Sequence, residues 1–457
     1  MYDIIIIGGG IAGVYSLYQL HKSSPHLKIL LIEKEKYLGG RVLTFQDKIM
    51  TVEEGAGRIS GSQPLIMSLI KELGLHSKLS KIESTAVFSP ADGTSSIESS
   101  MWDAPYQKNN ITNLLEPIYE NLLDIGFGPK TLPNVGLILK LVIASKTYSK
   151  KSLQNQTLES FAKKILTKEQ VEYIKRTFGY YSELVIMNAY DAIKLLNELG
   201  PNNTFYSLKG GLSQILDKME EKVSKNPNIK IMKGKEVKNI IHIQNQNQNQ
   251  EHFEIHLENK TIPAKKCICA LPKQALLKFR IFNPIKPMLN KVECGTLCRI
   301  YSKFEPNSQG KVWFKDLPKM TTDNELRMII PYNTKTGIIM ISYSDNIFAD
   351  YWKKIYDKKG IKEVNKVLQE KIQESTGIII PMPKHTHIFY WECGVGYWGV
   401  GADSEEVSKK MIQPIPNMEM YICGENYSEN YQQWMEGALE TADKIVKKTC
   451  SSPPKLT

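Results

Sequence analysis

Cysteine is scarce in this chain, and its spacing offers no metal site. The seven cysteines among 457 residues form no C-x-x-C pair and no His-linked metal pattern. An odd, scattered set is typical of reduced thiols in a reducing compartment. We therefore expect free thiols, no bound metal and a cytoplasmic protein.

Long apolar runs are also missing. The most apolar stretches, such as VGLILKLVIA, are interrupted by lysine and fall short of the roughly 20 residues that a membrane-spanning helix needs. The chain starts directly with the strand-like YDIIII, without a basic segment ahead of an apolar core. We expect neither a signal peptide nor a membrane span.

Positive charge is in excess, but it is dispersed. The net charge is +11, yet no basic helix with regular aromatic spacing occurs, so we expect no specific nucleic-acid partner. With 42% hydrophobic and 23% charged residues, the composition is that of an ordinary globular protein. The length favours two domains.

The pattern of helices and strands predicts an α/β fold in which two domains interleave. The opening residues give a strand, a glycine turn, a helix and a second strand, LKILLIE, which is a βαβ unit. A mostly helical stretch follows, and α/β character then returns. We assign a Rossmann-like nucleotide-binding domain and an α+β substrate-binding domain, followed by a polar tail at 451–457. The first comprises 1–62, 205–275 and 415–450, and the second comprises 63–204 and 276–414.

The turn after the first strand carries a dinucleotide fingerprint. Gly8, Gly10 and Gly13 fit G-x-G-x-x-G, which allows a tight turn, close approach of a pyrophosphate and close packing of helix and strand. Glu33 ends the second strand, where a carboxylate can accept hydrogen bonds from a ribose diol. A purely structural glycine turn would leave Glu33 unexplained.

A second glycine pair lies just beyond this acid. Gly39 and Gly40 expose backbone amides, and the guanidinium of Arg41 can pair with a phosphate as a bidentate donor. Enzymes that bind only a nicotinamide cofactor do not need this second clamp. The alternative for Arg41 is a surface arginine after a turn.

With these residues, the chain resembles the flavin-containing amine oxidase family, which includes monoamine, polyamine and L-amino-acid oxidases. The matches follow the family's order along nearly the whole chain. The N-terminal matches are shared with wider flavoproteins, whereas the C-terminal ones are more diagnostic. They are IIIIGGGIAGVYSLYQL, LIEKEKYLGGRV, VEEGAGRI, KGGLSQIL, CICALP, YICGENY and WMEGALETA.

The resemblance implies a flavin-binding domain of the glutathione-reductase type with non-covalent FAD. It implies an oxidase that removes hydride from a C–H bond beside an amine nitrogen, with reoxidation by O2 to give H2O2. The alternatives are a related flavoenzyme on a non-amine substrate, such as a desaturase or mutase, and a flavin-binding protein without turnover. A small-molecule amine is the expected partner, and a homodimer stays open.

Residue roles follow from the matching motifs. The resemblance assigns the ADP half of FAD to the two glycine motifs, the flavin's middle to Gly57 and Arg58, and the adenine to the backbone of Val237. It places the pyrophosphate and ribityl chain near Gly424 and Glu425, and the flavin's N1/O2 edge at the Met435 amide, aided by the helix dipole.

Two positions depart from the family pattern. Arg299 stands where the family usually has a lysine that holds a water near flavin N5, and arginine cannot act as a base. A structural ion pair is the alternative role for Arg299. Cys393 lies too close to Trp391 for the cysteine tether of monoamine oxidases, so we expect Cys393 and Cys423 to be buried thiols.

Aromatic residues of the C-terminal third are candidates for the substrate wall. Paired rings orient an amine and exclude water, and cation–π attraction adds roughly 0.5–2 kcal/mol. Core packing is the alternative for each ring. Glu183 is a candidate carboxylate for a second ammonium, or a charge on a helix surface. The candidate rings are Trp391, Tyr397, Trp398 and Trp434.

Overall fold

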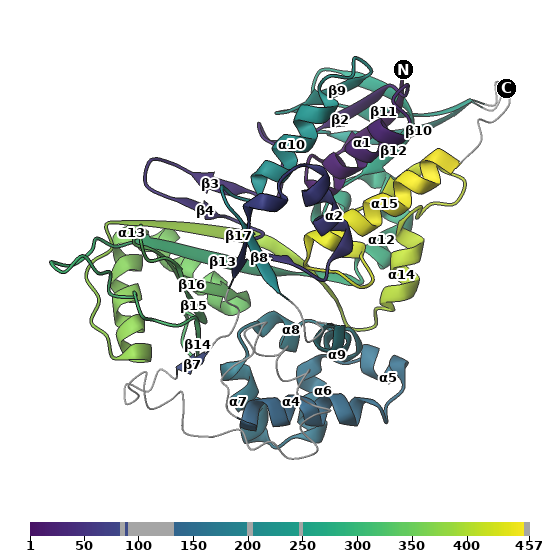
Figure 1. Ribbon diagram of the computed structural model, residues 1–457. Helices are drawn as coiled ribbons and strands as arrows, with labels where there is room; N and C mark the ends of the chain where they lie inside the picture. The colour runs from purple at the N-terminus through teal and green to yellow at the C-terminus, as the bar shows by residue number, and fades with distance from the viewer. Residues whose placement is uncertain (83–86, 90–131, 199–203, 246–249, 452–457) are drawn as a thin grey trace.

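The computed structural model describes residues 1–82, 87–89, 132–198, 204–245 and 250–451. Figure 1 shows two large sheets, each with its own helices, and a separate group of helices beside them. Within the described ranges, no helix combines the length and the apolar character that a membrane crossing needs.

The first sheet has seven strands in the order β10-β11-β12-β1-β2-β9, with β18 beside β12. The strands β9, β2, β1, β12 and β18 run parallel, and β10 and β11 form an antiparallel extension. The apolar run that ends β1 is buried, as expected for a parallel strand covered on both faces. The strands are β1 (Tyr2–Ile7), β2 (Ile29–Ile32), β9 (Ile229–Met232), β10 (Asn239–Asn245), β11 (Gln250–His256), β12 (Thr261–Cys269) and β18 (Met420–Ile422).

Helices from both ends of the chain pack on this sheet. The helix α1 contacts both α10 and α15, and α15 also contacts α2. Figure 1 shows α1 (purple) beside α15 (yellow), although they lie at opposite ends of the sequence. The elements are α1 (Ile11–Ser23), α2 (Pro64–Glu72), η1 (His76–Lys78), α10 (Ser213–Val223), α11 (Lys273–Leu276), η2 (Arg280–Ile285), α12 (Lys286–Leu289), η3 (Glu425–Tyr427) and α15 (Met435–Ser451).

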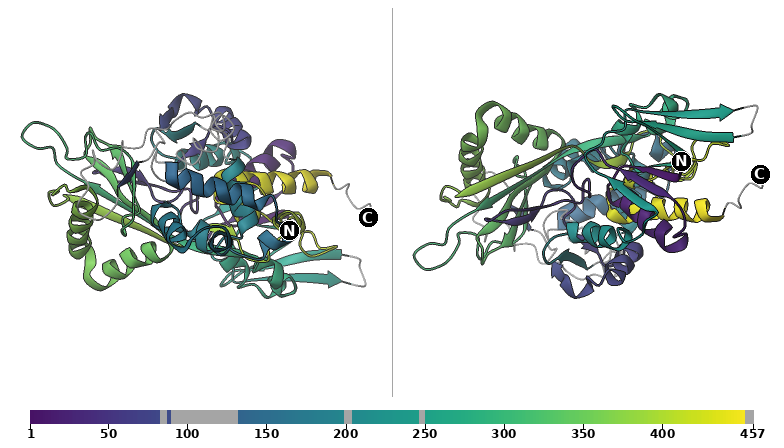
Figure 2. Two further views of the ribbon diagram at one scale, coloured as in Figure 1. Left: turned by 90° about the horizontal axis from the view of Figure 1, so that it is seen from below. Right: turned by 90° about the horizontal axis from the view of Figure 1, so that it is seen from above.

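The second large sheet has the order β17-β13-β16-β15-β14-β7. The helix α13 packs against β13 and β16 and is kinked at Gly360, whose φ is 74°. Figure 2 shows this sheet and α13 at the end of the molecule opposite the two termini. The elements are β7 (Val87–Ser89), β13 (Val292–Lys303), β14 (Met320–Thr322), β15 (Met328–Asn333), β16 (Ile338–Asp345), α13 (Asn346–Thr376) and β17 (His385–Trp398).

Short helices and two small sheets complete the fold. Thr157 and Thr167 cap α6 and α7 by accepting backbone N–H groups, which accounts for two of the helix starts. The helices are α4 (Leu132–Ser145), α5 (Lys150–Gln154), α6 (Leu158–Ile165), α7 (Lys168–Thr177), α8 (Tyr181–Val185), α9 (Ala189–Glu198) and α14 (Ser404–Met411). The small sheets contain β3 (Thr44–Gln46) with β4 (Thr51–Glu53), and β5 (Ile59–Ser60), β6 (Leu79–Ile82) and β8 (Phe205–Leu208).

One expectation about the cysteines is wrong. Cys294 on β13 and Cys393 on β17 form a disulfide, with their Cα atoms 5.0 Å apart. The two strands are antiparallel neighbours, which brings together residues 99 positions apart in sequence. Cys393 is therefore not a free thiol, whereas Cys423 is free and buried as expected. The disulfide weakens the thiol argument for a reducing compartment, so cytoplasmic location stays a prediction.

The first sheet draws its strands from three parts of the chain: β1 and β2, then β9 to β12, and finally β18. The helices α4 to α9 and the second sheet come mostly from the segments between these parts. The domain limits given above stay a proposal.

Candidate functional site

A cavity of about 590 Å³ lies at the carboxyl ends of the parallel strands. Gly8 follows β1, Glu33 follows β2, Ala270 follows β12 and Gly424 lies just after β18, and all four residues line the cavity. The carboxyl ends of an open parallel sheet are where α/β folds bind their ligands. The second sheet and α8 supply the remaining wall.

The glycine fingerprint shapes one end of the cavity. Gly8 has a φ of +105°, and a Cβ there would lie 2.4 Å from the Ala270 carbonyl oxygen. A Cβ on Gly13 would lie 2.0 Å from the Gly8 carbonyl oxygen. By contrast, a Cβ on Gly10 would meet only the Gly39 carbonyl oxygen, at 3.9 Å, so Gly10 keeps space open at the start of α1. This open, positively polarised helix end suits a pyrophosphate.

Glu33 is held in place by the backbone. Its Oε2 accepts the Gly9 N–H at 2.6 Å and its Oε1 accepts the Glu35 N–H at 2.8 Å. A carboxylate has about four lone-pair sites, so Glu33 keeps capacity for ribose hydroxyls. Val237 also lines the cavity, and its assignment to the adenine stays a prediction.

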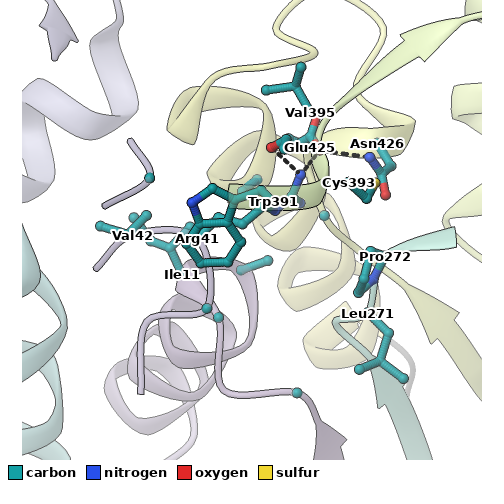
Figure 3. Close-up of a pocket in the computed structure, with 18 of the residues that line it drawn as sticks. Ile11, Arg41, Val42, Leu271, Pro272, Trp391, Cys393, Val395, Glu425 and Asn426 are labelled. Carbon is teal, nitrogen blue, oxygen red and sulfur yellow. Dashed lines mark hydrogen bonds and ion pairs between the residues drawn. The ribbon is translucent and has the colours of Figure 1, made fainter. Parts of the chain in front are cut away.

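Arg41 and Glu425 contact each other across 384 residues of sequence (Figure 3). Arg41 Nη1 donates to Glu425 Oε1 at 2.6 Å and to the Gly394 carbonyl oxygen at 3.1 Å. Both bonds use one nitrogen, which leaves other N–H groups of the guanidinium for a phosphate. Glu425 Oε2 accepts the Gln433 N–H at 2.9 Å, so the pair also positions the loop before α15.

Arg299 contacts Gly57, which the resemblance places along the flavin. A Cβ on Gly57 would lie only 2.6 Å from Arg299 Nη1, and both residues line the cavity. The guanidinium carbon lies 4.9 Å from the Tyr343 ring centroid, and Nη1 donates to the Glu53 carbonyl oxygen at 3.3 Å. Burial alone would lower the pKa of Arg299, but the Tyr301 and Tyr343 hydroxyls raise it above its ordinary value. Arg299 therefore supplies a permanent positive charge.

A buried carboxyl group lies beside this cation. Burial raises the pKa of Glu53 to about 7, although the Leu212 N–H, the Thr44 hydroxyl and the charge of Arg299 all oppose the shift. Glu53 Oε1 accepts the Leu212 N–H at 2.8 Å, and Oε2 accepts the Thr44 hydroxyl at 2.9 Å. Glu53 thus joins β4 to the start of α10.

Trp434 and Arg58 are neighbours at the start of α15. The Trp434 ring stacks on Phe205, with centroids 5.9 Å apart and an interplanar angle of 12°. The Arg58 guanidinium lies 4.5 Å from the Phe205 centroid and 5.5 Å from the Trp434 centroid. Arg58 Nη2 donates to the Tyr180 hydroxyl at 2.9 Å, and Arg58, Trp434 and Tyr180 all line the cavity.

The aromatic residues of β17 divide between cavity and core. Tyr397 and Trp391 line the cavity. The expectation that Trp398 does so is wrong, because this side chain is only 1% exposed, packs in the core and donates its Nε1–H to the Ser428 carbonyl oxygen at 3.2 Å. Successive strand residues point to opposite faces, so Tyr397 and Trp398 cannot both face the cavity.

The surroundings of the start of α15 account for the sequence Trp-Met-Glu-Gly at 434–437. Met435 is the first residue of the helix and lines the cavity. A Cβ on Gly437 would lie 2.2 Å from the Tyr431 carbonyl oxygen, so the preceding loop folds back against this glycine. Glu436 turns away from the cavity and accepts the N–H groups of Leu65 and Ile66 at the start of α2.

Several cavity residues escaped prediction from the sequence. Tyr180, Tyr343 and Asp345 all line the cavity, but no short motif marks them. They lie in segments whose position depends on tertiary contacts. Glu183 is buried in the cavity wall, so its alternative as a helix-surface charge is wrong.

The residues present fit FAD. Gly10 leaves open space at a helix N-terminus, and Glu33 retains acceptor capacity for a ribose. Arg299 also lines the cavity, and its buried Nε has no hydrogen-bond partner within the part of the chain that the structure describes. These features would serve, in order, the pyrophosphate, the ribose and the flavin of one extended ligand.

Known proteins resemble this chain along most of its length. An uncharacterised protein of Acanthamoeba polyphaga mimivirus is 24% identical over 98% of this chain and 93% of its own. Aplysianin-A of Aplysia kurodai is also 24% identical, over 99% of this chain and 92% of its own. A solved structure of putrescine oxidase superposes with a TM-score of 0.72 at 13% identity and covers 99% of both chains.

A match to the sequence pattern of a known family identifies the family of this chain. The pattern described as "flavin containing amine oxidoreductase" matches residues 11–446. The predicted fold class, a Rossmann-like FAD-binding domain interleaved with an α+β domain, is confirmed, and so is FAD as the cofactor. The chain belongs to the flavin-containing amine oxidoreductase family.

Proposed function

We propose that this flavin oxidoreductase oxidises a small amine and uses O2 as its electron acceptor. The observation that carries the proposal is one continuous cavity, lined by the dinucleotide fingerprint and by the polar and aromatic residues of the second sheet and α8. FAD, when bound, would supply the acceptor for hydride from the C–H bond beside the amine nitrogen. O2 would then accept two electrons and two protons and leave as H2O2.

The chain's own residues bind and orient the reactants. The Gly10 turn and Glu33 would hold the ADP half, and Met435 would present its backbone N–H at the start of α15. Trp434 and Tyr397 would narrow the approach of the amine and exclude water. Arg299 would place a fixed positive charge near the reacting atoms without exchanging a proton.

The cysteine contacts favour non-covalent attachment of FAD. Cys393 lines the cavity, but its sulfur is bonded to Cys294 and is therefore not available for a thioether to the cofactor. Denaturation should release the yellow chromophore into the supernatant. Colour that stays with the precipitated protein would contradict this attachment.

A substrate panel tests the activity. We expect at least one monoamine, diamine or amino acid to bleach the flavin absorbance without air, and aeration to restore the absorbance with formation of peroxide. Bleaching without restoration in air would replace O2 by another acceptor. No bleaching by any amine would favour a desaturase-like or mutase-like enzyme, or a flavin-binding protein without turnover.

A further inference from the structure

Glu183 is a buried carboxyl group in the cavity wall, and one of its oxygens lacks a hydrogen bond within the described structure. The residue is 6% exposed and lines the cavity, yet its Oε2 has no hydrogen-bond partner among the described residues. Taking a carboxylate out of water without a partner costs several kcal/mol. A group retained in this condition inside a ligand cavity is suited to pair with the ligand.

The position of Glu183 is built by its neighbours. Asp345 accepts the Tyr181 N–H at 3.1 Å and the Ser182 N–H at 2.7 Å, which anchors the start of α8 and holds the next residue at the cavity. The charge of Arg327 acts on Asp345, and both Nη atoms of this arginine donate to backbone carbonyls while its guanidinium lies over the Phe348 ring. Neither Asp345 nor Arg327 neutralises Glu183 Oε2.

Two other carboxylates that line the cavity have hydrogen-bond partners among the described residues. Glu33 accepts two backbone N–H groups, and Glu425 pairs with Arg41. Arg58, the nearest guanidinium to the Tyr180 hydroxyl, forms no ion pair with Glu183 in the described structure. Of these three carboxylates, Glu183 alone has an oxygen without any hydrogen-bond partner among the described residues.

The groups around Glu183 favour a cation over water. Tyr397 on β17 and Tyr180, which directly precedes α8, are close enough to Glu183 to interact with it electrostatically, and Asp345 adds a second negative charge. Burial and the charge of Asp345 raise the pKa of Glu183 well above its ordinary value, so arrival of a cation would favour its ionised form. Aromatic rings beside a carboxylate are good neighbours for an ammonium group.

We propose that Glu183 binds a second cationic group of the substrate, distinct from the amine that is oxidised. This inference rests on the proposed amine oxidation and deepens it. The shared chemistry is a molecule with two basic nitrogens, of which one must lose its proton to react while the other stays charged. A diamine and an amino acid with a basic side chain both fit this description.

Two pairs of compounds test the inference on the holoenzyme. 1,5-Diaminopentane and 1-aminopentane differ by the second cation alone, as do L-lysine and L-norleucine. Stopped-flow reduction of the flavin without air gives the Kd of each compound. We expect the dication of at least one pair to bind about 30-fold or more tightly than its partner. Each ratio reports the second cation alone, because the α-carboxylate is common to both members of the lysine pair and absent from both members of the diamine pair.

Glu183→Gln is the decisive variant, because it keeps the shape of the side chain and removes its charge. We expect it to abolish the preference for the dication while the compound with one amine binds as before. Glu172→Gln is the matched control, since Glu172 lies on the exposed face of the neighbouring α7 and pairs only with Lys175 among the contacts described. Glu183→Asp, which retains the charge, should keep part of the preference.

Each result decides the inference. A wild-type enzyme without preference for either dication, or a Glu183→Gln variant that weakens both members of a pair equally, overturns it. If no amine reduces the flavin, the proposed function fails, and calorimetric titration with 1,5-diaminopentane and 1-aminopentane still measures the cation preference. Equal or undetectable heats for the two compounds would then reject Glu183 as a cation site.

Discussion

Arg299 gives the cavity a positive charge that does not depend on pH. We predict that Arg299→Lys raises the rate constant for reoxidation of the reduced enzyme by O2, about tenfold or less, because a lysine can hold a water and exchange a proton, whereas a guanidinium cannot. Stopped-flow mixing of reduced enzyme with aerated buffer measures this rate constant. An unchanged rate constant, with FAD still bound, would remove Arg299 from oxygen chemistry.

Glu53 makes stability depend on pH in a direction unusual for a carboxyl group. Its pKa rises from the ordinary value of 4.5 to about 7 on folding, so the folded state holds the proton more tightly than the unfolded state. The free energy of unfolding should therefore fall as pH rises from about 4.5 to about 7, and level off above that. The shift corresponds to about 3 kcal/mol.

Glu53→Gln tests this linkage because it retains the shape of the side chain without the ionisation. Urea denaturation at several pH values should show a smaller fall in stability between pH 5 and pH 8 for the variant than for the wild type. Parallel curves for the two proteins would show that another group controls this range.

At the scale of elements, two residues near the start of α15 have different predicted roles: Trp434 contacts the substrate, and Gly437 supports FAD binding. Trp434 extends into the cavity just before the helix, whereas Gly437 permits contact with the preceding loop. We predict that Trp434→Ala changes substrate KM values about tenfold and leaves the Kd for FAD within about threefold. Gly437→Ala should instead weaken FAD binding, since its Cβ would overlap the Tyr431 carbonyl oxygen. Equal loss of FAD in both variants would make Trp434 a packing residue.

The disulfide joins the long strands β13 and β17, which form part of the cavity wall. It closes a loop of 99 residues, and such cross-links typically add about 2–4 kcal/mol to stability. We predict that Cys294→Ser with Cys393→Ser lowers the free energy of unfolding by that amount. The wild type in reducing agent should match this double variant. A wild type insensitive to reductant would mean that the bond does not form in solution.

Local sequence signals predict the part of the site that lies within one βαβ unit. The turn at Gly8–Gly13 and the acid at Glu33 lie within one βαβ unit, so spacing alone predicts their contacts. Contacts between segments that are distant in sequence differ from the predictions. Whether the Trp398 side chain lies in the cavity or in the core depends on which face of β17 is turned inward. The partner of Cys393 depends on the pairing of strands whose cysteines are 99 residues apart. Contacts of this kind arise from tertiary packing and leave no short motif.

For the whole molecule, the cavity exists only when distant parts of the chain pack together. Its walls come from residues near the N-terminus, from the middle of the chain and from the region after β17, so an unfolded chain cannot assemble it. The pairing of Arg41 with Glu425 joins the first and last of these parts. Binding of FAD would therefore stabilise the fold as a unit, in addition to filling the site.

We predict that FAD raises the free energy of unfolding by about 2.7 kcal/mol at a free concentration of one hundred times its Kd, because only the folded chain binds it. Thermal denaturation of apoenzyme at increasing FAD concentration should show a midpoint that rises steadily with the logarithm of concentration. ADP should reproduce part of the rise through the Gly10 turn and Glu33, and riboflavin alone should produce little. A rise with riboflavin equal to that with FAD would place the binding energy at the flavin end and contradict the role of the fingerprint.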